Sequence, residues 1–361
     1  MAESSPSILV RAPNWIGDQI LAYPFFHFLR AARPGARITV ACAPWVEDVQ
    51  FRHLVDEVIP LEKPEGSGFW PRFRAIEKSA AQLRGRTFDL GITLPNSVSS
   101  AWYLFRAGAK VRRGYRADGR GVLLTESVKA PLHIVHRAES YLDLLPSGIR
   151  APREALEFWG VPAANELDPG LPGIESEFDA ARAWPQADLV EPPDGDYWVV
   201  APGANAEARR WPVERYVELC RRVNRETGAR AVIVGGLAEV RLAMRISEEL
   251  GSGVLDRTAQ GPVSCLWKLF RRARFTVTND SGLAHVASLC GSKVQIIWGA
   301  GDPKRTQPIG PGKVRILFNP VDCWPCEQNT CRMPAAQKIQ CLKGISPDAV
   351  WDEMKSGLKP L

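Results

Sequence analysis

The stretch "SILVRAPNWIGDQILAYPFFHFLRAA", Ser7 to Ala32, contains the pattern on which most of the chain is built. A short apolar run predicts a strand, a turn follows with Gly17 and Asp18, and an amphipathic run then predicts a helix that ends before Pro34. Repeated strand–turn–helix units build a parallel sheet covered by helices. The turn lacks the G-x-G-x-x-G spacing of a dinucleotide-binding loop and has one glycine followed by an acid.

The same alternation continues on both sides of one irregular segment. Strand candidates are "SILVRA", "RITVACA", "EVIPL" and "DLGITL" in the first half, and "YWVVAPG", "ARAVIVGG", "FTVTND", "KVQIIWG" and "VRILF" in the second. Residues 159–198 between them are rich in proline, glycine and acids, which is typical of a domain boundary. We therefore predict an α/β protein of two doubly wound domains that face each other across a cleft, with ligands beyond the carboxyl ends of the strands.

Composition agrees with this organisation. The chain has 361 residues, 45% of them hydrophobic, which is enough for two cores. Lys and Arg number 46 against 40 Asp and Glu, a mildly basic balance that suits an anionic ligand without singling out nucleic acid. The first residues do not resemble a signal peptide, and no apolar run is long enough to cross a bilayer. We expect a cytoplasmic protein, with weak contact to an anionic membrane surface permitted by its charge.

Asp18 has two interpretations. An acid is favoured in the first turn of a helix, where it interacts with the helix dipole. At the carboxyl end of a strand it can also be a general base that faces the ligand. The dipole would keep the carboxylate ionised, so a base here would need close positioning against the hydroxyl that it deprotonates.

The stretch "TNDSGLAHVASLCG", which begins at Thr278, is the most specific in the chain. A strand runs into Asp280, Ser281 and Gly282, and an amphipathic helix follows. Backbone N–H groups and hydroxyls at such a helix start form an anion site that fits a diphosphate, and an ordinary helix cap is the alternative. His285, four residues after Ser281, would face the same side as the first turn, as a ligand contact or as a structural histidine.

Two further loops follow strands of the second half. "APGANAEARRWP" contains Gly203, which allows close approach to the backbone, and Arg209 and Arg210, which can bind phosphate or form a solvated basic loop. "WGAGDPKRTQPIG" places Gly299 and Asp302 at the same edge of the sheet.

An arginine group lies in the first half. Arg112, Arg113 and Arg116 in "KVRRGYRADGR" follow "LPNSVSSAWYLFRAGA" in the half that contains Asp18, so they either contact an anionic acceptor or form a solvated face.

The last cysteines have the spacing C-x2-C-x4-C-x9-C. They are Cys323, Cys326, Cys331 and Cys341. Four thiolates at short spacing can bind a structural zinc ion, but the spacing is irregular for a zinc ribbon, and free or paired thiols are the favoured alternative.

Taken together, "APNWIGD", "LPNSVSSA", "PGANAEARRWP", "TNDSGLAHVA" and "GAGDP" resemble the ADP-heptose:lipopolysaccharide heptosyltransferases of glycosyltransferase family nine, most closely the heptosyltransferase II type. The resemblance covers nearly the whole chain. It implies the GT-B architecture of two Rossmann-like domains: an acceptor domain over residues 1–185 that carries the base, a nucleotide-sugar domain over 186–345, and a last helix over 346–361 that returns to the first domain.

The resemblance also implies roles for residues. Asp18 would be the base that takes the acceptor's proton, with Asn96 and the arginine group on the acceptor side. Thr278, Asp280, Ser281, Gly282 and His285 would surround the donor's diphosphate and sugar. Arg209 stands where the family commonly has a phosphate-binding lysine, Arg210 could share that task, and Glu239 is a ribose partner by analogy.

The reaction implied is an inverting transfer of L-glycero-D-manno-heptose from ADP-heptose to a heptose of the lipopolysaccharide inner core. As the resemblance implies it, this reaction requires no cofactor or metal. The alternatives are heptosyltransferase I or another family-nine transferase, a nicotinamide-dependent oxidoreductase, which the missing glycine motif disfavours, and a non-catalytic glycan- or RNA-binding protein.

Overall fold

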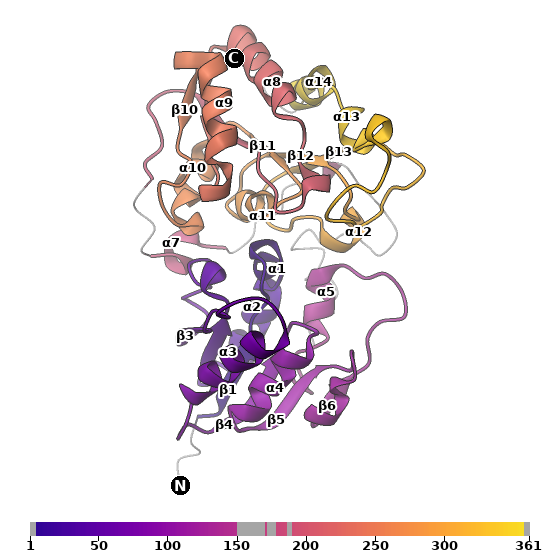
Figure 1. The fold of residues 1–361 in the computed structure, drawn as a ribbon. Helices are drawn as coiled ribbons and strands as arrows, with labels where there is room; N and C mark the ends of the chain where they lie inside the picture. The colour runs from indigo at the N-terminus through magenta and orange to yellow at the C-terminus, as the bar shows by residue number, and fades with distance from the viewer. Residues whose placement is uncertain (1–4, 150–169, 172–177, 186–189, 357–361) are drawn as a thin grey trace. The chain divides into compact units, whose positions relative to one another are not determined.

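The computed structural model describes residues 5–149, 170–171, 178–185 and 190–356 (Figure 1). They form two compact units, one of residues 5–149 and 181–185, the other of the remaining described residues. Most of the expected boundary segment, 159–198, lies outside the described residues. The two units are considered separately below.

The first unit contains a fully parallel sheet with the strand order β3-β2-β1-β4-β5-β6. Its strands are β1 (Ser7–Arg11), β2 (Arg37–Cys42), β3 (Glu57–Pro60), β4 (Phe88–Thr93), β5 (Ala109–Tyr115) and β6 (Glu126–Val128). The chain order reverses between β1 and β4, and ligands of doubly wound sheets bind at the carboxyl ends of the strands at such a point. The first four strands were predicted; β5 and β6 were not, because their arginines and acids hide the apolar pattern.

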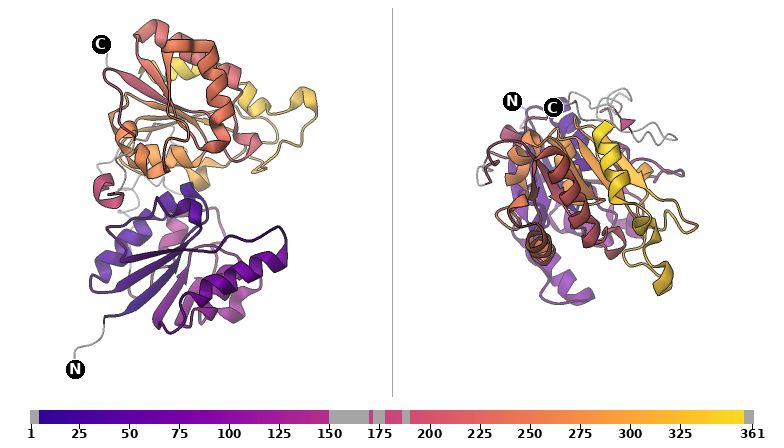
Figure 2. Two further views of the ribbon diagram at one scale, coloured as in Figure 1. Left: turned by 60° about the vertical axis from the view of Figure 1, so that its left-hand side comes forward. Right: turned by 90° about the horizontal axis from the view of Figure 1, so that it is seen from above.

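Helices flank both sides of this sheet (Figure 2). They are α1 (Ile16–Leu21), α2 (Tyr23–Ala32), α3 (Phe69–Ala81), α4 (Val98–Arg106) and α5 (Arg137–Leu142), with the short 3-10 helices η1 (Pro44–Val46) and η2 (Arg120–Leu123). The single helix predicted after Gly17 is in fact two, α1 and α2, which meet at Ala22. Pro24 lacks the backbone N–H that would continue the hydrogen-bond ladder through this point.

The second unit repeats the topology of the first. Its sheet has the order β10-β9-β8-β11-β12-β13-β7, parallel except for the edge strand β7. The strands are β7 (Gly170–Leu171), β8 (Tyr197–Ala201), β9 (Arg230–Ile233), β10 (Val254–Asp256), β11 (Thr276–Asn279), β12 (Val294–Trp298) and β13 (Val314–Phe318). Here the order reverses between β8 and β11. The prediction of two doubly wound Rossmann-like domains is thus confirmed.

The helices named from residue 180 onward include both long crossovers and single turns. They are α7 (Ala180–Ala183), α8 (Val213–Thr227), α9 (Val240–Leu250), α10 (Trp267–Arg272), α11 (Gly282–Leu289), α12 (Pro303–Thr306), α13 (Gln340–Lys343) and α14 (Pro347–Ser356), with η3 (Glu207–Arg209), η4 (Leu237–Glu239), η5 (Gly251–Gly253), η6 (Val263–Leu266) and η7 (Ala335–Gln337). Among the described residues no helix is both long and apolar enough to cross a bilayer.

The last helix, α14, packs within the second unit. Val350, Trp351 and Met354 are buried in the same hydrophobic core as α8. The apolar face of α14 thus packs against α8 within the second unit, and the expected return of residues 346–361 to the first domain stays a prediction.

A charged cluster fastens α14 to α8. Glu226 accepts hydrogen bonds from Trp351 Nε1 at 2.8 Å and from Arg222 Nε at 2.9 Å, and its carboxylate lies 2.6 Å from Lys355 Nζ. These donors, Lys355 first, lower the pKa of Glu226 to about 2. Because the folded pKa is below the unfolded one, the ionised carboxylate stabilises the docked helix above about pH 4.5, and this contribution is lost as the pH falls toward 2.

We expect the protection of residues 347–356 against hydrogen exchange, relative to the intrinsic rate at each pH, to fall over that pH interval, because protonation of Glu226 removes the negative charge that strengthens its bonds to all three donors. In Glu226→Gln the loss of protection should be present already at pH 7 and should change little with pH. Equal pH dependence in both proteins would contradict this account. Glu218→Gln on the same helix is the control.

Candidate functional site

The Asp18 turn is held rigidly at the carboxyl end of β1. Arg11 is 6% exposed and donates to the carbonyl of Ala12 and to Asn14 Oδ1. Trp45 Nε1 donates to the Asn14 carbonyl at 2.6 Å. Burial lowers the pKa of Arg11 to about 10, so the guanidinium stays charged at neutral pH. Sequence reasoning missed Arg11 and Trp45, whose contribution depends on contacts across the fold.

Asp18 lies in the first turn of α1 with its side chain 23% exposed. Arg137 Nε, at the start of α5, is 3.9 Å from Asp18 Oδ1, a weak electrostatic contact. The nearby Tyr141 has a pKa well above 10, first because it is buried and then because the Asp18 carboxylate repels its phenolate. Asp18 is therefore an accessible carboxylate on a fixed turn, close to a protonated phenol and a guanidinium.

The loop after β4 lies beside this turn, since Leu94 N donates to the Arg11 carbonyl at 3.1 Å. Arg120 is fully buried and holds the loop through the carbonyls of Pro95 and Ser97 and through Asn96 Oδ1, at 3.1 Å for the last. Burial lowers the pKa of Arg120 to about 10. Arg120 is thus a scaffold for the exposed Asn96.

Arg112 and Arg113 have internal partners that the sequence did not reveal. Arg112 Nε donates to the Leu123 carbonyl at 2.7 Å. Arg113 donates to the Leu144 carbonyl at 3.1 Å and pairs with Glu126 at 3.1 Å. Both sit in β5 and brace its neighbours, and the acceptor contact expected for them stays a prediction. Arg116, just after β5, is exposed.

In the second unit, Asp280 and Arg209 form an ion pair at the carboxyl ends of β8 and β11. Their Oδ2 and Nη1 atoms are 3.1 Å apart, with Asp280 3% and Arg209 31% exposed. Arg210 instead donates to the carbonyls of Ala204 and Asn205, at 2.6 and 3.2 Å. Arg210 therefore fastens its own loop, and only Arg209 combines a partly exposed guanidinium with a contact to the Asp280 segment.

Asn279 connects the two strand ends. Its side-chain oxygen accepts from Trp211 N at 3.1 Å and from the Tyr216 hydroxyl at 2.9 Å, and its nitrogen donates to the Pro202 carbonyl at 2.7 Å. A fully buried amide with partners on both sides sets the position of the Arg209 loop relative to β11.

The segment from Thr278 to His285 forms the start of α11. Thr278 and His285 are buried, and the Thr278 and Ser281 hydroxyls lie 3.2 Å apart. Ser281 occupies the N-cap position without a side-chain cap hydrogen bond, and Gly282 is the first helical residue. The ordinary cap considered from sequence is thus not made by Ser281.

Glycines allow three loops to approach closely around this segment. A Cβ on Gly203 would lie 2.4 Å from Glu239 Cγ, and Glu239 itself accepts from Gly236 N at 2.9 Å. A Cβ on Gly299 would lie 2.5 Å from the Ala208 carbonyl oxygen. Asp302, 9% exposed, caps α12 by accepting from Lys304 N at 3.0 Å. Glu239 and Gly299 thus lie at the strand-end site, and Asp302 has a structural contact.

Gly299→Ala should test this close approach. The added methyl would meet a backbone atom that cannot rotate away, so we expect a loss of roughly 1–3 kcal/mol in the free energy of unfolding and weaker nucleotide binding. Thermal unfolding and nucleotide titration measure the two effects. Gly35→Ala is the matched control, because Gly35, like Gly299, is not at positive φ and its new methyl would meet only Ser5 Oγ, at 3.9 Å; equal effects in both variants would refute the packing explanation.

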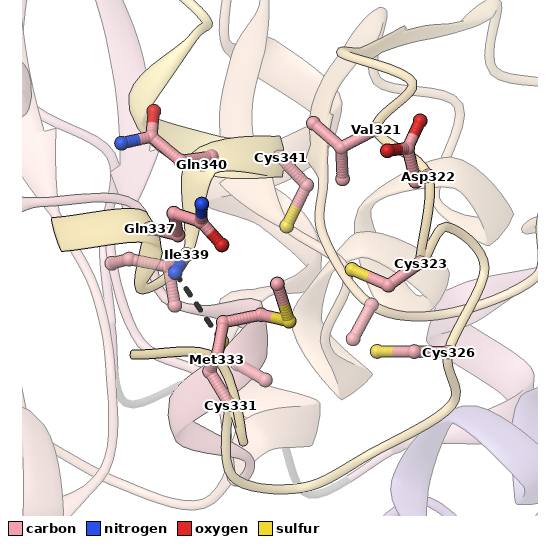
Figure 3. Close-up of a pocket in the computed structure, with 12 residues that line it drawn as sticks. Val321, Asp322, Cys323, Cys326, Cys331, Met333, Gln337, Ile339, Gln340 and Cys341 are labelled. Atoms are coloured by element: carbon pink, nitrogen blue, oxygen red, sulfur yellow. Dashed lines mark hydrogen bonds between the residues drawn. The ribbon is translucent and has the colours of Figure 1, made fainter. Parts of the chain in front are cut away.

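The four late cysteines line one cavity of about 210 Å³, which Figure 3 shows. Cys323, Cys326 and Cys341 direct their sulfur atoms toward this space, and Cys331 Sγ accepts from Ile339 N at 3.3 Å. The pKa of the Cys341 thiol is raised by burial and then by the neighbouring cysteines. Within the described part of the chain, no three metal-ligating side chains are grouped closely enough to hold an ion.

The cysteine segment supports the strand-end loops directly. Ala208 N donates to the Asn329 carbonyl at 3.0 Å, and Glu327 N donates to the Ala300 carbonyl at 2.8 Å. Trp324 Nε1 donates to the Gly299 carbonyl at 2.8 Å. These bonds attach the segment to both the Arg209 loop and the Gly299 loop.

Comparison with known proteins identifies the family to which this chain belongs. The family model "Glycosyltransferase family 9 (heptosyltransferase)" matches residues 76–337. Lipopolysaccharide heptosyltransferase 2 of Escherichia coli K12 is 26% identical over 86% of this chain and 87% of its own. Lipopolysaccharide heptosyltransferase 1 of Pseudomonas aeruginosa is 24% identical over 90% of this chain and 87% of its own.

Among solved structures, E. coli ADP-heptose lps heptosyltransferase II has the same fold. It superposes with a TM-score of 0.72 at 24% identity and covers 97% of this chain and 98% of its own. The chain has two Rossmann-like domains of the GT-B type, and the family model matches more than half of it; this chain therefore belongs to glycosyltransferase family 9, the heptosyltransferase family.

Proposed function

We propose that this protein is an inverting heptosyltransferase of type II. It transfers L-glycero-D-manno-heptose from ADP-heptose to the heptose of the lipopolysaccharide inner core. Family membership and the heptosyltransferase 2 relatives support this activity. The observation that carries it is the accessible Asp18 carboxylate, at the point where the order of the first sheet reverses, on a turn that buried Arg11 holds in place.

In the proposed mechanism Asp18 accepts the proton of an acceptor hydroxyl while that oxygen attacks the anomeric carbon of the donor. The bond from this carbon to the ADP oxygen breaks on the opposite face, so the configuration inverts. A fixed carboxylate suits this task because general-base catalysis depends first on the distance and direction to the proton.

Negative charge grows on the departing diphosphate. Arg209 has donors left over from its contact with Asp280, and the first amides of α11 supply positive partial charge. We assign the diphosphate to this region, the donor sugar to the neighbourhood of Thr278 and His285, and the ribose to Glu239. Preorganised charges aimed at a developing anion often contribute the largest share of catalysis.

The base and the donor region belong to different units, so turnover requires the two to meet. We propose that donor and acceptor binding brings the units together through a hinge near residues 183–197, of which 186–189 lie outside the described residues. Small-angle scattering with ADP and acceptor should report a smaller radius of gyration than without them. An unchanged radius would argue against the hinge and leave the donor assignment in place.

The activity is tested by measuring ADP release from ADP-heptose with and without heptosyl-Kdo2-lipid A. Release that depends on this acceptor supports type II activity. Release only with Kdo2-lipid A would indicate type I activity, for which the P. aeruginosa relative is the precedent. Failure to bind ADP-heptose, combined with binding of NAD or RNA, would replace the proposal by one of the other classes.

The proposal includes a cytoplasmic location at the inner membrane, where such an acceptor is embedded. No nucleic acid and no cofactor beyond the donor substrate takes part in the proposed reaction.

A further inference from the structure

An exposed row of aromatic rings crosses α3 and α4 of the first unit. We call Phe69, Trp70, Phe73, Trp102 and Phe105 the aromatic ridge. Neighbouring ring centroids lie 5.3 Å apart for Phe69 and Trp70, 6.0 Å for Phe73 and Trp102, and 5.4 Å for Trp102 and Phe105. The two helices pack side by side, so the rings form one continuous surface.

Both ends of the ridge are far more exposed than a packed core permits. Phe69 and Trp70, at one end, are 71% and 69% exposed, and Phe105, at the other, is 45% exposed. The middle of the ridge is anchored, because Trp102 Nε1 donates to Glu77 at 2.6 Å. Contiguous exposed aromatic surface of this kind is typical of an interaction site, and Trp and Tyr favour the boundary between lipid and water.

Positive charge surrounds the ridge. Arg74 follows Trp70 by one helical turn and is exposed, and it forms no ion pair with any of the described residues. Lys78 follows Arg74 by another turn and pairs only with the exposed Glu65, at 3.2 Å. At this spacing Arg74 and Lys78 lie on the same face of α3 as Trp70. Aromatic rings together with long cationic side chains are the combination that binds an anionic lipid surface.

The Phe69–Trp70 end of the ridge lies at the functional end of its domain. In a β-α unit the helix begins near the carboxyl end of the preceding strand, and α3 and α4 follow β3 and β4. Phe69, Trp70 and the exposed Val98 are therefore at the same edge of the sheet as Asp18 and Asn96.

We propose that the aromatic ridge, with Arg74 and Lys78, docks the first domain on an anionic phospholipid bilayer. The rings enter the interface and the cations contact lipid phosphates. The docking brings Asp18 to the sugar of a lipid-anchored acceptor; this consequence, unlike the docking itself, rests on the proposed function.

The test uses the full chain with vesicles of phosphatidylglycerol and phosphatidylethanolamine, and with neutral phosphatidylcholine vesicles. We expect cosedimentation with the anionic vesicles and little with the neutral ones. The double variant Phe69→Ser/Trp70→Ser should partition about tenfold or more weakly, since two large rings leave the interface. Arg74→Gln/Lys78→Gln should weaken only the binding to anionic vesicles.

The matched control is Val122→Ser/Leu132→Ser, because these side chains are 91% and 104% exposed in the same unit but outside the ridge. Equal losses in the control and in the ridge variant would overturn the proposal, as would absence of binding by the native chain. Vesicle binding needs neither donor nor acceptor, so its outcome is independent of whether the heptosyltransferase assay succeeds. Circular dichroism of each variant confirms that a lost interaction is not a lost fold.

Discussion

Asp18→Asn is expected to lower kcat by roughly 10²- to 10⁴-fold, the usual contribution of a positioned general base. The amide is nearly the same size as the carboxylate but cannot accept the acceptor's proton. Because the proposed donor contacts all come from the second unit and Asp18 belongs to the first, affinity for ADP-heptose should change little. The measurements are ADP release under saturating substrates and donor affinity by calorimetry.

The control for this variant is Asp89→Asn. Asp89 also lies on the first sheet, but at the amino end of β4, where it pairs with Lys110 at 2.9 Å. It should keep native kcat. Native kcat in Asp18→Asn would remove Asp18 from the mechanism, and an equal fall in both variants would point to a general effect on the domain.

Arg209→Ala is expected to lower kcat/KM by roughly 10²- to 10³-fold, comparable to the loss of one preorganised donor at a developing anion. It should also reduce stability by about 3–5 kcal/mol, because the carboxylate of Asp280, 3% exposed, is left without its guanidinium. Arg209→Lys keeps the positive charge, so its kcat/KM and its stability should lie between those of the native protein and those of Arg209→Ala.

The two roles of Arg209 can be separated by adding Asp280→Asn to Arg209→Ala. The double variant removes the buried negative charge that has lost the Arg209 guanidinium, so thermal stability should recover in part while kcat/KM stays low. Recovery of both would mean that Arg209 acts only by holding Asp280. Arg221→Ala, which breaks the exposed pair with Glu249 on the same domain, should leave both quantities near their native values.

Local sequence patterns were sufficient for the two-domain α/β architecture, although strands β5, β6, β7 and β10 were not predicted. Apolar runs such as residues 8–10 and 197–201 become buried strands, and the turns after β1 and β11 occur where glycine, asparagine and acids follow those runs. These signals are local because strand formation and helix starts depend on neighbouring residues. The same argument placed Asp18 and Thr278 at strand ends, while their catalytic and donor-binding roles stay predictions.

The roles of the arginines could not be predicted from the neighbouring sequence. Arg120 and Arg116 are neighbours in the same basic stretch, yet one is fully buried among carbonyls and the other is exposed. Arg209 and Arg210 are adjacent, but only the first pairs with Asp280. The role of an arginine depends on which hydrogen-bond acceptors the fold places near its guanidinium, and some of those acceptors are distant in sequence.

The sequence by itself thus determined two parallel α/β domains of one family and the strand ends at which chemistry can occur. Tertiary structure alone decided which charges are available there, that α14 packs on α8, and that the cysteine segment supports the Arg209 and Gly299 loops. The physical reason is distance along the chain. Helix and strand periodicity depends on residues a few positions apart, whereas burial and ion pairing join side chains from separate elements.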